Sequence, residues 1–189
     1  MSEVRRKQMY FDKLRNRGWR AAEVILGYNL NVMEKISNRA LISRLYSSAE
    51  HELQVADFDN EDWSKWYEVV QKLTGPEKMV YVIVKLNKTI TNGGFVEFFQ
   101  SSFGVFAPEI IHVLTEIKAN VSAEIVSSSL PIVNPEGLLD EDYKKFIFHV
   151  QLSDEQRSQL YSLDMRYDYL QDQENLEDLL GDYIQETIK

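Results

Sequence analysis

Apolar residues recur at helical spacing through the middle of the chain. Met79, Ile83, Leu86 and Ile90 follow a 4-3-4 pattern, which places them on one face of an α-helix. The residues Thr74 to Glu77 precede them and form a capping-box sequence with a proline in the first turn. The β-branched residues of this stretch favour a strand by propensity, but propensity is a weaker guide than periodicity combined with a cap. We therefore predict a helix that begins after Thr74.

Similar patterns predict helices along most of the remaining sequence. They are expected over residues 3–16, 19–45, from Asn60, from Pro108, over 121–130 and 140–151, and from a second capping box at Ser153 to Leu170. Two prolines and a glycine predict a loop over 131–137. The last helix has the most regular apolar face, made of Leu176, Leu179, Leu180, Tyr183, Ile184 and Ile188. The fold class is predicted to be all-α, a single-domain bundle of about eight to nine helices.

Composition supports a folded domain and excludes several kinds of site. Of the 189 residues, 44% are hydrophobic and 12% aromatic, which is ample for a core. The chain has no cysteine, which excludes disulfides, zinc–thiolate sites, iron–sulfur clusters and a cysteine nucleophile. We expect no cofactor. The first residues lack the apolar segment of a secretory signal, and no apolar run is long enough to span a membrane, so a cytoplasmic location is predicted.

Charge is distributed unevenly along the chain. The net charge is −9, yet residues 1–50 carry ten Lys/Arg against five Asp/Glu, whereas residues 131–189 carry five against fourteen. Nucleic-acid-binding proteins usually present a dominant basic face, and the acidic end would repel phosphates, so direct binding to nucleic acid is not expected. We divide the chain into a basic helical extension, residues 1–50, and a domain over residues 51–189.

Acidic residues near the C-terminus repeat every four positions. Between Ser158 and Ile188 there are eight acidic residues and one basic residue, Arg166. Like charges at this spacing destabilise a helix by about 0.2–0.5 kcal/mol per pair, so the pattern needs an explanation. A face that binds a basic protein, an ordinary solvated face, and a surface covered by the basic extension all remain open. The predicted partner-binding face comprises Asp164, Asp168, Asp172, Glu174, Asp178, Asp182 and Glu186.

The most unusual string is Asn92-Gly93-Gly94-Phe95, followed by Phe98, Phe99 and Phe103. One interpretation is structural: a buried aromatic helix whose glycines allow close packing, ended by Gly104. The other is an anion-binding helix N-terminus capped by Asn92. No nearby lysine repeats the phosphate-loop pattern, so the structural interpretation is favoured.

The segment from Leu86 to Phe99, with Ser101-Ser102-Phe103-Gly104 after it, resembles the signature of the bacterial DNA-mimic protein (DMP-type) domain family. The similarity extends from about Asn60 to the C-terminus. Glu97 and Ser101 depart from the glutamine and asparagine common in that family. The resemblance implies an all-helical domain, self-association, no enzymatic role, and an acidic surface that imitates DNA and occupies a DNA-binding protein.

Enzymatic and metal chemistry find no comparable support. Glu109, His112 and Glu116 have a spacing found in di-metal carboxylate sites, but such sites need a second Glu-x-x-His step. We expect His112 to be structural and no metal to bind, and we expect Trp63 and Trp66 to be core residues. The sequence thus predicts a non-enzymatic module that binds a basic protein. The alternative is a small-molecule or anion-binding domain that uses the helix start at Asn92-Gly93-Gly94.

Overall fold

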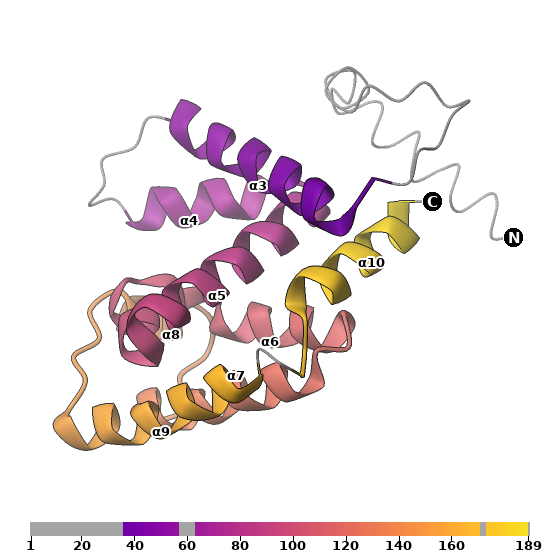
Figure 1. The fold of residues 1–189 in the computed structure, drawn as a ribbon. Helices are drawn as coiled ribbons and strands as arrows, with labels where there is room; N and C mark the ends of the chain where they lie inside the picture. The colour runs from indigo at the N-terminus through magenta and orange to yellow at the C-terminus, as the bar shows by residue number, and fades with distance from the viewer. Residues whose placement is uncertain (1–35, 57–62, 171–172, 189) are drawn as a thin grey trace, which may run out of the picture. The chain divides into compact units, whose positions relative to one another are not determined.

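The computed structural model describes residues 36–56, 63–170 and 173–188. These ranges contain helices and no strand, which confirms the predicted all-α fold (Figure 1). The helices are α3 (Asn38–Val55), α4 (Trp63–Lys72), α5 (Gly75–Gln100), the short 3₁₀ helix η1 (Phe103–Phe106), α6 (Ala107–Glu116), α7 (Asn120–Val133), α8 (Asp140–Ile147), α9 (Asp154–Leu170) and α10 (Leu176–Ile188).

Helix α5 lies at the centre of the bundle. It packs against α3, α6, α9 and η1, while α7 packs on α6 and α9, and α10 packs mainly on α3 (Figure 1). Its inner residues are fully or almost fully buried. They include Val80, Tyr81, Val82, Ile83, Leu86, Ile90, Phe95, Phe98 and Phe99.

The start of α5 is the predicted one. The Glu77 amide donates to Thr74 Oγ1 at 3.4 Å, and the Thr74 amide donates to Glu77 Oε2 at 3.2 Å. Both bonds of a capping box are therefore present. Val80, Val82 and Ile83 remain helical despite their β-branched side chains because all three are buried against neighbouring helices.

The second capping box is also present, but three predicted helices have different bounds. Within the described part of the predicted helix over 19–45, residues 36–37 are not helical, and α3 runs from Asn38 to Val55 with Ser37 as its N-cap. The Ser153 amide donates to Gln156 Oε1 at 2.9 Å, and the Gln156 amide donates to Ser153 Oγ at 3.2 Å. Helix α7 continues through Pro131 to Val133, so the loop begins three residues later than predicted. Pro131 has no N–H to donate to the carbonyl of Ser127, and both residues are exposed. Helix α8 stops at Ile147, short of the predicted Gln151.

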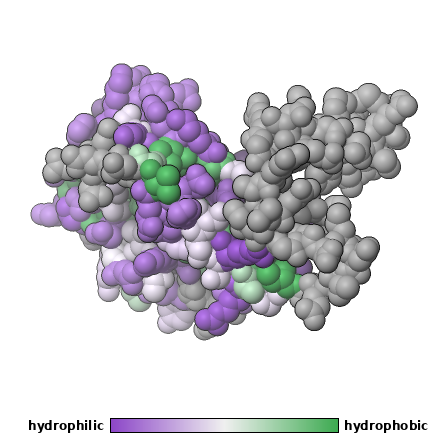
Figure 2. Space-filling model, turned by 90° about the horizontal axis from the view of Figure 1, so that it is seen from above, coloured by the Kyte–Doolittle hydropathy of each residue, from purple (hydrophilic) through white to green (hydrophobic). Residues whose placement is uncertain are grey.

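The chain divides into two compact units, Met1–Lys35 and Ile36–Lys189. The predicted helix over 3–16, most of that over 19–45, and the predicted cap at Asn60 lie outside the described residues. Within the second unit, the face shown in Figure 2 is largely hydrophilic, in keeping with the exposed polar residues on the outer side of α3. The division at residue 50 remains a prediction about where the family domain starts.

Candidate functional site

The Asn92-Gly93-Gly94-Phe95 block lies within α5, where the helix is kinked. Gly94 has φ 71° and ψ −173°, a conformation that is essentially restricted to glycine. The Phe95 amide donates to Asp164 Oδ1 of α9 at 2.7 Å. A Cβ atom on Gly94 would lie 2.4 Å from Asp164 Oδ2. The glycine therefore lets a carboxylate of one helix reach the backbone of another.

The aromatic residues that follow the kink face inward. Phe95 and Tyr167 of α9 meet edge to face, with ring centroids 6.0 Å apart. Phe98 and Phe99 meet in the same way at 5.0 Å. Helix α5 ends at Gln100, before Gly104, and a Cβ on Gly104 would lie 2.5 Å from Phe99 Cδ1. Gly104 is thus required for contact with Phe99, whereas the sequence predicted that it ends the helix.

The predicted anion site requires a free amide at the Gly94 step, and Asp164 already bonds to the Phe95 amide. A bound anion would have to displace a carboxylate of the same sign. Burial raises the pKa of Asp164 above its ordinary value, the Phe95 amide opposes that shift, and the neighbouring Asp168 adds to it. This arrangement favours an internal role for the block over ligand binding.

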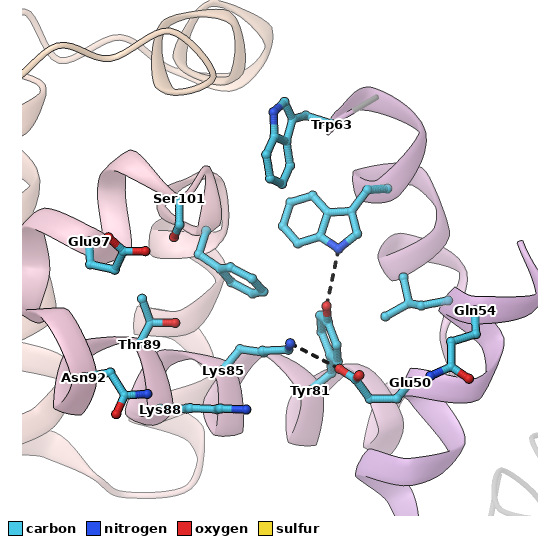
Figure 3. Close-up of a pocket in the computed structure, with 13 residues that line it drawn as sticks. Glu50, Gln54, Trp63, Tyr81, Lys85, Lys88, Thr89, Asn92, Glu97 and Ser101 are labelled. Carbon is cyan, nitrogen blue, oxygen red and sulfur yellow. Dashed lines mark hydrogen bonds and ion pairs between the residues drawn. The ribbon is translucent and has the colours of Figure 1, made fainter. Parts of the chain in front are cut away.

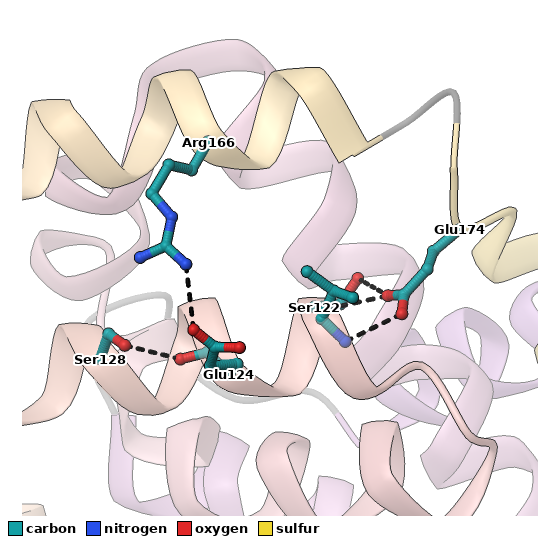
Figure 4. A network of polar contacts seen from close by, with 6 residues as sticks. Ser122, Glu124, Ser128, Arg166 and Glu174 are labelled. Carbon is teal, nitrogen blue, oxygen red and sulfur yellow. Dashed lines mark hydrogen bonds and ion pairs between the residues drawn. The ribbon is translucent and has the colours of Figure 1, made fainter.

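Glu174 also bonds inside the protein. It accepts hydrogen bonds from the Val121 amide at 2.8 Å and from the Ser122 amide and hydroxyl at 2.9 and 2.7 Å (Figure 4). These amides begin α7, whose N-cap residue is Ala119 and offers no side-chain acceptor. A carboxylate there also interacts favourably with the positive end of the helix dipole. Glu174 therefore caps α7 from a distant part of the sequence.

The carboxylates of α10 are arranged differently. Asp178, Asp182 and Glu186 are exposed, and so is Glu177, which the sequence prediction did not include. Asn38 of α3 donates to Asp182 Oδ1 at 3.0 Å and to the Asp178 carbonyl at 3.3 Å. Helix α10 contains no lysine or arginine. Its outer side is consequently a surface of exposed carboxylates along the edge shared with α3.

The remaining predicted acidic residues are Asp168 and Asp172. Asp168 is exposed on α9, whereas Asp172 lies outside the described residues. The nearby Arg166 is held by Glu124 of α7, with Nη2 and Oε1 3.1 Å apart (Figure 4). Residues two apart on a helix do not face each other, so Arg166 points away from Asp168.

A groove of about 790 Å³ lies between α3, α4 and the face of α5 that bears Asn92 (Figure 3). Trp66, 6% exposed, donates from Nε1 to the Tyr81 hydroxyl at 3.3 Å, whereas Trp63 is 38% exposed. Burial raises the pKa of Tyr81 to about 12. Lys85 pairs with Glu50 at 3.2 Å, and the other charged lining residues, Lys88 and Glu97, are also of opposite sign. The lining residues that the structure describes carry no net charge and so give no preference for an anion.

Two of the three residues considered for metal binding bond to other side chains. Glu109 pairs with Lys78 at 2.6 Å, Glu116 accepts from the Tyr183 hydroxyl, and His112 is exposed. Among the described residues no cluster of histidine and acidic side chains could hold a metal ion.

Within the same part of the chain, no helix is both long and apolar enough to cross a membrane.

One surface feature was missed at the sequence level. Tyr161, Met165 and Tyr169 are exposed on α9, on the side opposite its buried residues Leu163 and Tyr167. The signal was available, because α9 has large side chains at helical spacing on both sides, more than one buried face needs.

Comparison with known proteins gives one finding. A family model described as DMP19-like protein matches residues 71–187, more than half of the chain. Neither the curated proteins nor the solved structures gave a match. The matched region includes the kink at Gly94, the cap at Glu174 and the carboxylates of α10.

Proposed function

Because this chain belongs to the DMP19-like protein family, we propose that it is a non-enzymatic module whose acidic C-terminal helices bind a basic protein. In this proposal the module imitates the charge of DNA, occupies the nucleic-acid-binding surface of a DNA-binding protein, and thereby regulates transcription in the cytoplasm. The observation that supports it most is α10, which exposes Glu177, Asp178, Asp182 and Glu186 and contains no basic residue. An ordinary solvated helix would mix both signs.

The spacing of these carboxylates bears on the proposal. Residues four apart on a helix are separated by about 6 Å along its axis, whereas one DNA strand has a phosphate every 3.4 Å or so. The row formed by Asp178, Asp182 and Glu186 therefore has roughly half the linear charge density of one strand. Glu177 adds charge beside this row, and Asp168 adds charge on α9. Self-association, which the family resemblance implies, would add a second set.

The acidic residues of the predicted face differ in how much they contribute to the fold. Asp164 and Glu174 each satisfy backbone amides inside the protein, so their substitution would disturb the fold as well as the surface. Asn175 caps the start of α10 by accepting from the Asp178 amide at 3.2 Å, and its side-chain amide donates to the Asp178 carboxylate at 2.7 Å. Asp168 and Glu186 are therefore the positions at which charge can be removed with the least structural effect. At Asp182, which accepts a hydrogen bond from Asn38, asparagine keeps a side-chain oxygen that can accept it.

The test is capture of a DNA-binding protein and competition with DNA. The immobilised chain is offered proteins from a cell extract, and each captured DNA-binding protein is purified and titrated with labelled duplex DNA. We expect the chain and the duplex to exclude each other, and complex formation to weaken steeply between about 50 and 200 mM salt. The triple variant Asp168→Asn, Asp182→Asn, Glu186→Gln is expected to lose most of the affinity.

A control variant with the same change in net charge carries Asp142→Asn, Asp154→Asn and Glu155→Gln, all exposed carboxylates outside the proposed surface. It should bind like the unmodified chain. Equal losses in the two triple variants would indicate a general effect of net charge. Simultaneous binding of chain and duplex to the partner would contradict DNA imitation.

A further inference from the structure

The exposed side chains Tyr161, Met165 and Tyr169 form a continuous row on α9, here called the α9 stripe. They are 65%, 50% and 76% exposed, respectively. Because successive members are four residues apart, they lie on one side of the helix over about 12 Å. Single exposed apolar side chains are common in proteins, but three in a row on one helix form a patch that indicates an interaction site.

The stripe is not explained by the packing of α9. Leu160, Leu163, Tyr167 and Leu170 already fill the buried side of the helix, against α5 and α7. Within the described part of the chain, neither Tyr161 nor Tyr169 makes a hydrogen bond or a ring contact. The tyrosine rings and hydroxyls are therefore available to another molecule.

One exposed carboxylate lies beside the stripe. Asp168 is exposed and lies three residues from Met165 and seven from Tyr161, which places it within the stripe. The exposed cation of this segment, Arg166, is two residues from Asp168 and so does not face it, and it pairs with Glu124 (Figure 4). The patch thus combines two aromatic faces, a thioether and an unpaired carboxylate.

This combination suits arginine better than lysine. The planar guanidinium group can stack on a tyrosine ring and at the same time form two parallel hydrogen bonds with a carboxylate. An ammonium group is a compact, strongly hydrated charge that cannot stack in this way. A second copy of this chain would bring another Asp168 and another acidic surface to the same place, so charge complementarity favours a basic occupant.

We propose that the α9 stripe, with Asp168, is a docking surface for an arginine-rich face of the partner protein, and that it selects arginine over lysine. The inference rests on the proposed function, because it concerns the same basic partner. It goes further because it places a contact on α9 in addition to α10 and names arginine as the preferred side chain of the partner. Aromatic side chains in the centre of a contact often contribute most of the binding energy, and acidic residues around them then set specificity and association rate.

The experiment measures binding of the full chain to an oligo-arginine and an oligo-lysine peptide of equal length. We expect the oligo-arginine peptide to bind more tightly, and the variant Tyr161→Ala, Tyr169→Ala to lose about tenfold in affinity for oligo-arginine but little for oligo-lysine. Tyr161→Phe, Tyr169→Phe keeps the rings and should keep the preference. Ser158→Ala, Ser162→Ala, at exposed positions of the same helix, serves as control, and circular dichroism checks that every variant is folded.

The outcomes separate this inference from the function on which it rests. If neutralising Asp182 and Glu186 abolishes binding of both peptides while the alanine variant retains the arginine preference, the stripe is not the docking surface and the acidic module stands. If neither set of substitutions affects binding, both ideas fail. If the alanine variant alters the sedimentation mass of the free chain and leaves peptide preference intact, the stripe is a contact between copies, and the inference is overturned.

Discussion

At the scale of single residues, Gly94 and Asp164 explain why the block at the centre of the chain has its unusual sequence. The positive φ of Gly94 and the short distance to Asp164 are separate constraints, and each excludes a side chain. Their joint effect is to join α5 to α9 through the Phe95 amide. The residues that look most like a ligand site thus hold two helices together.

Replacing Gly94 with alanine should therefore destabilise the protein markedly. We expect the free energy of unfolding to fall by about 2–3 kcal/mol, because alanine would occupy a region of backbone conformations that is almost exclusive to glycine and its Cβ would collide with Asp164. Chemical denaturation monitored by circular dichroism measures the change. Gly137→Ala is the matched control, since Gly137 also has a positive φ of 66° but a Cβ at that position would meet no heavy atom within 4 Å. An equal loss in both variants would show that the contact with Asp164 contributes nothing.

At the scale of helices, the caps show two different sources of stability. The caps of α5 and α9 come from their own sequence, through Thr74 with Glu77 and Ser153 with Gln156. The start of α7 is satisfied by Glu174, more than 50 residues further along the chain. Only the first kind of cap can be recognised in a sequence, because it depends on residues a fixed distance apart.

The Glu174 cap predicts different effects on the free energy of unfolding for two substitutions of glutamate. Glu174→Ala should lower the free energy of unfolding by about 1–2 kcal/mol, because two amides and a hydroxyl at the start of α7 lose their acceptor. Glu186→Gln is the comparison, since Glu186 lies near the C-terminal end of α10, where a negative charge opposes the helix dipole. It should leave stability unchanged or raise it by up to about 0.5 kcal/mol. A similar response to both substitutions, measured by thermal or urea unfolding, would contradict the assigned cap.

At the scale of the whole molecule, the described helices share one hydrophobic core within the unit Ile36–Lys189. Residues 1–35 contain eight Lys/Arg and four Asp/Glu, a charge of +4, so the remainder of the −9 chain carries −13. Removing the first segment therefore makes the protein more acidic and retains every core residue that the structure describes.

We expect the fragment 36–189 to fold without residues 1–35. Its circular dichroism should show a helical protein, and its urea unfolding should remain a single cooperative transition. Its higher net charge should make its stability more dependent on salt than that of the full chain, because screening relieves a larger self-repulsion. A fragment without cooperative unfolding would show that residues 1–35 are part of the folding unit.

The sequence alone determined the helical class, the start of α5 and α9, and the excess of acidic residues towards the C-terminus. These features depend on neighbours within one or two helical turns, so spacing and composition reveal them. The sequence also resembles the DMP-type family, and the family match over residues 71–187 confirms that membership.

Only the tertiary structure decided what each acidic residue does. Asp164 and Glu174 bond to amides of other helices, whereas Asp168, Asp182 and Glu186 are exposed, although all five belong to the same repeating pattern. Periodicity tells which residues share a side of a helix, but not which other helix covers that side. For the same reason the sequence did not predict the α9 stripe. Tyr161 and Tyr169 are exposed because α5 and α7 cover the opposite side of α9.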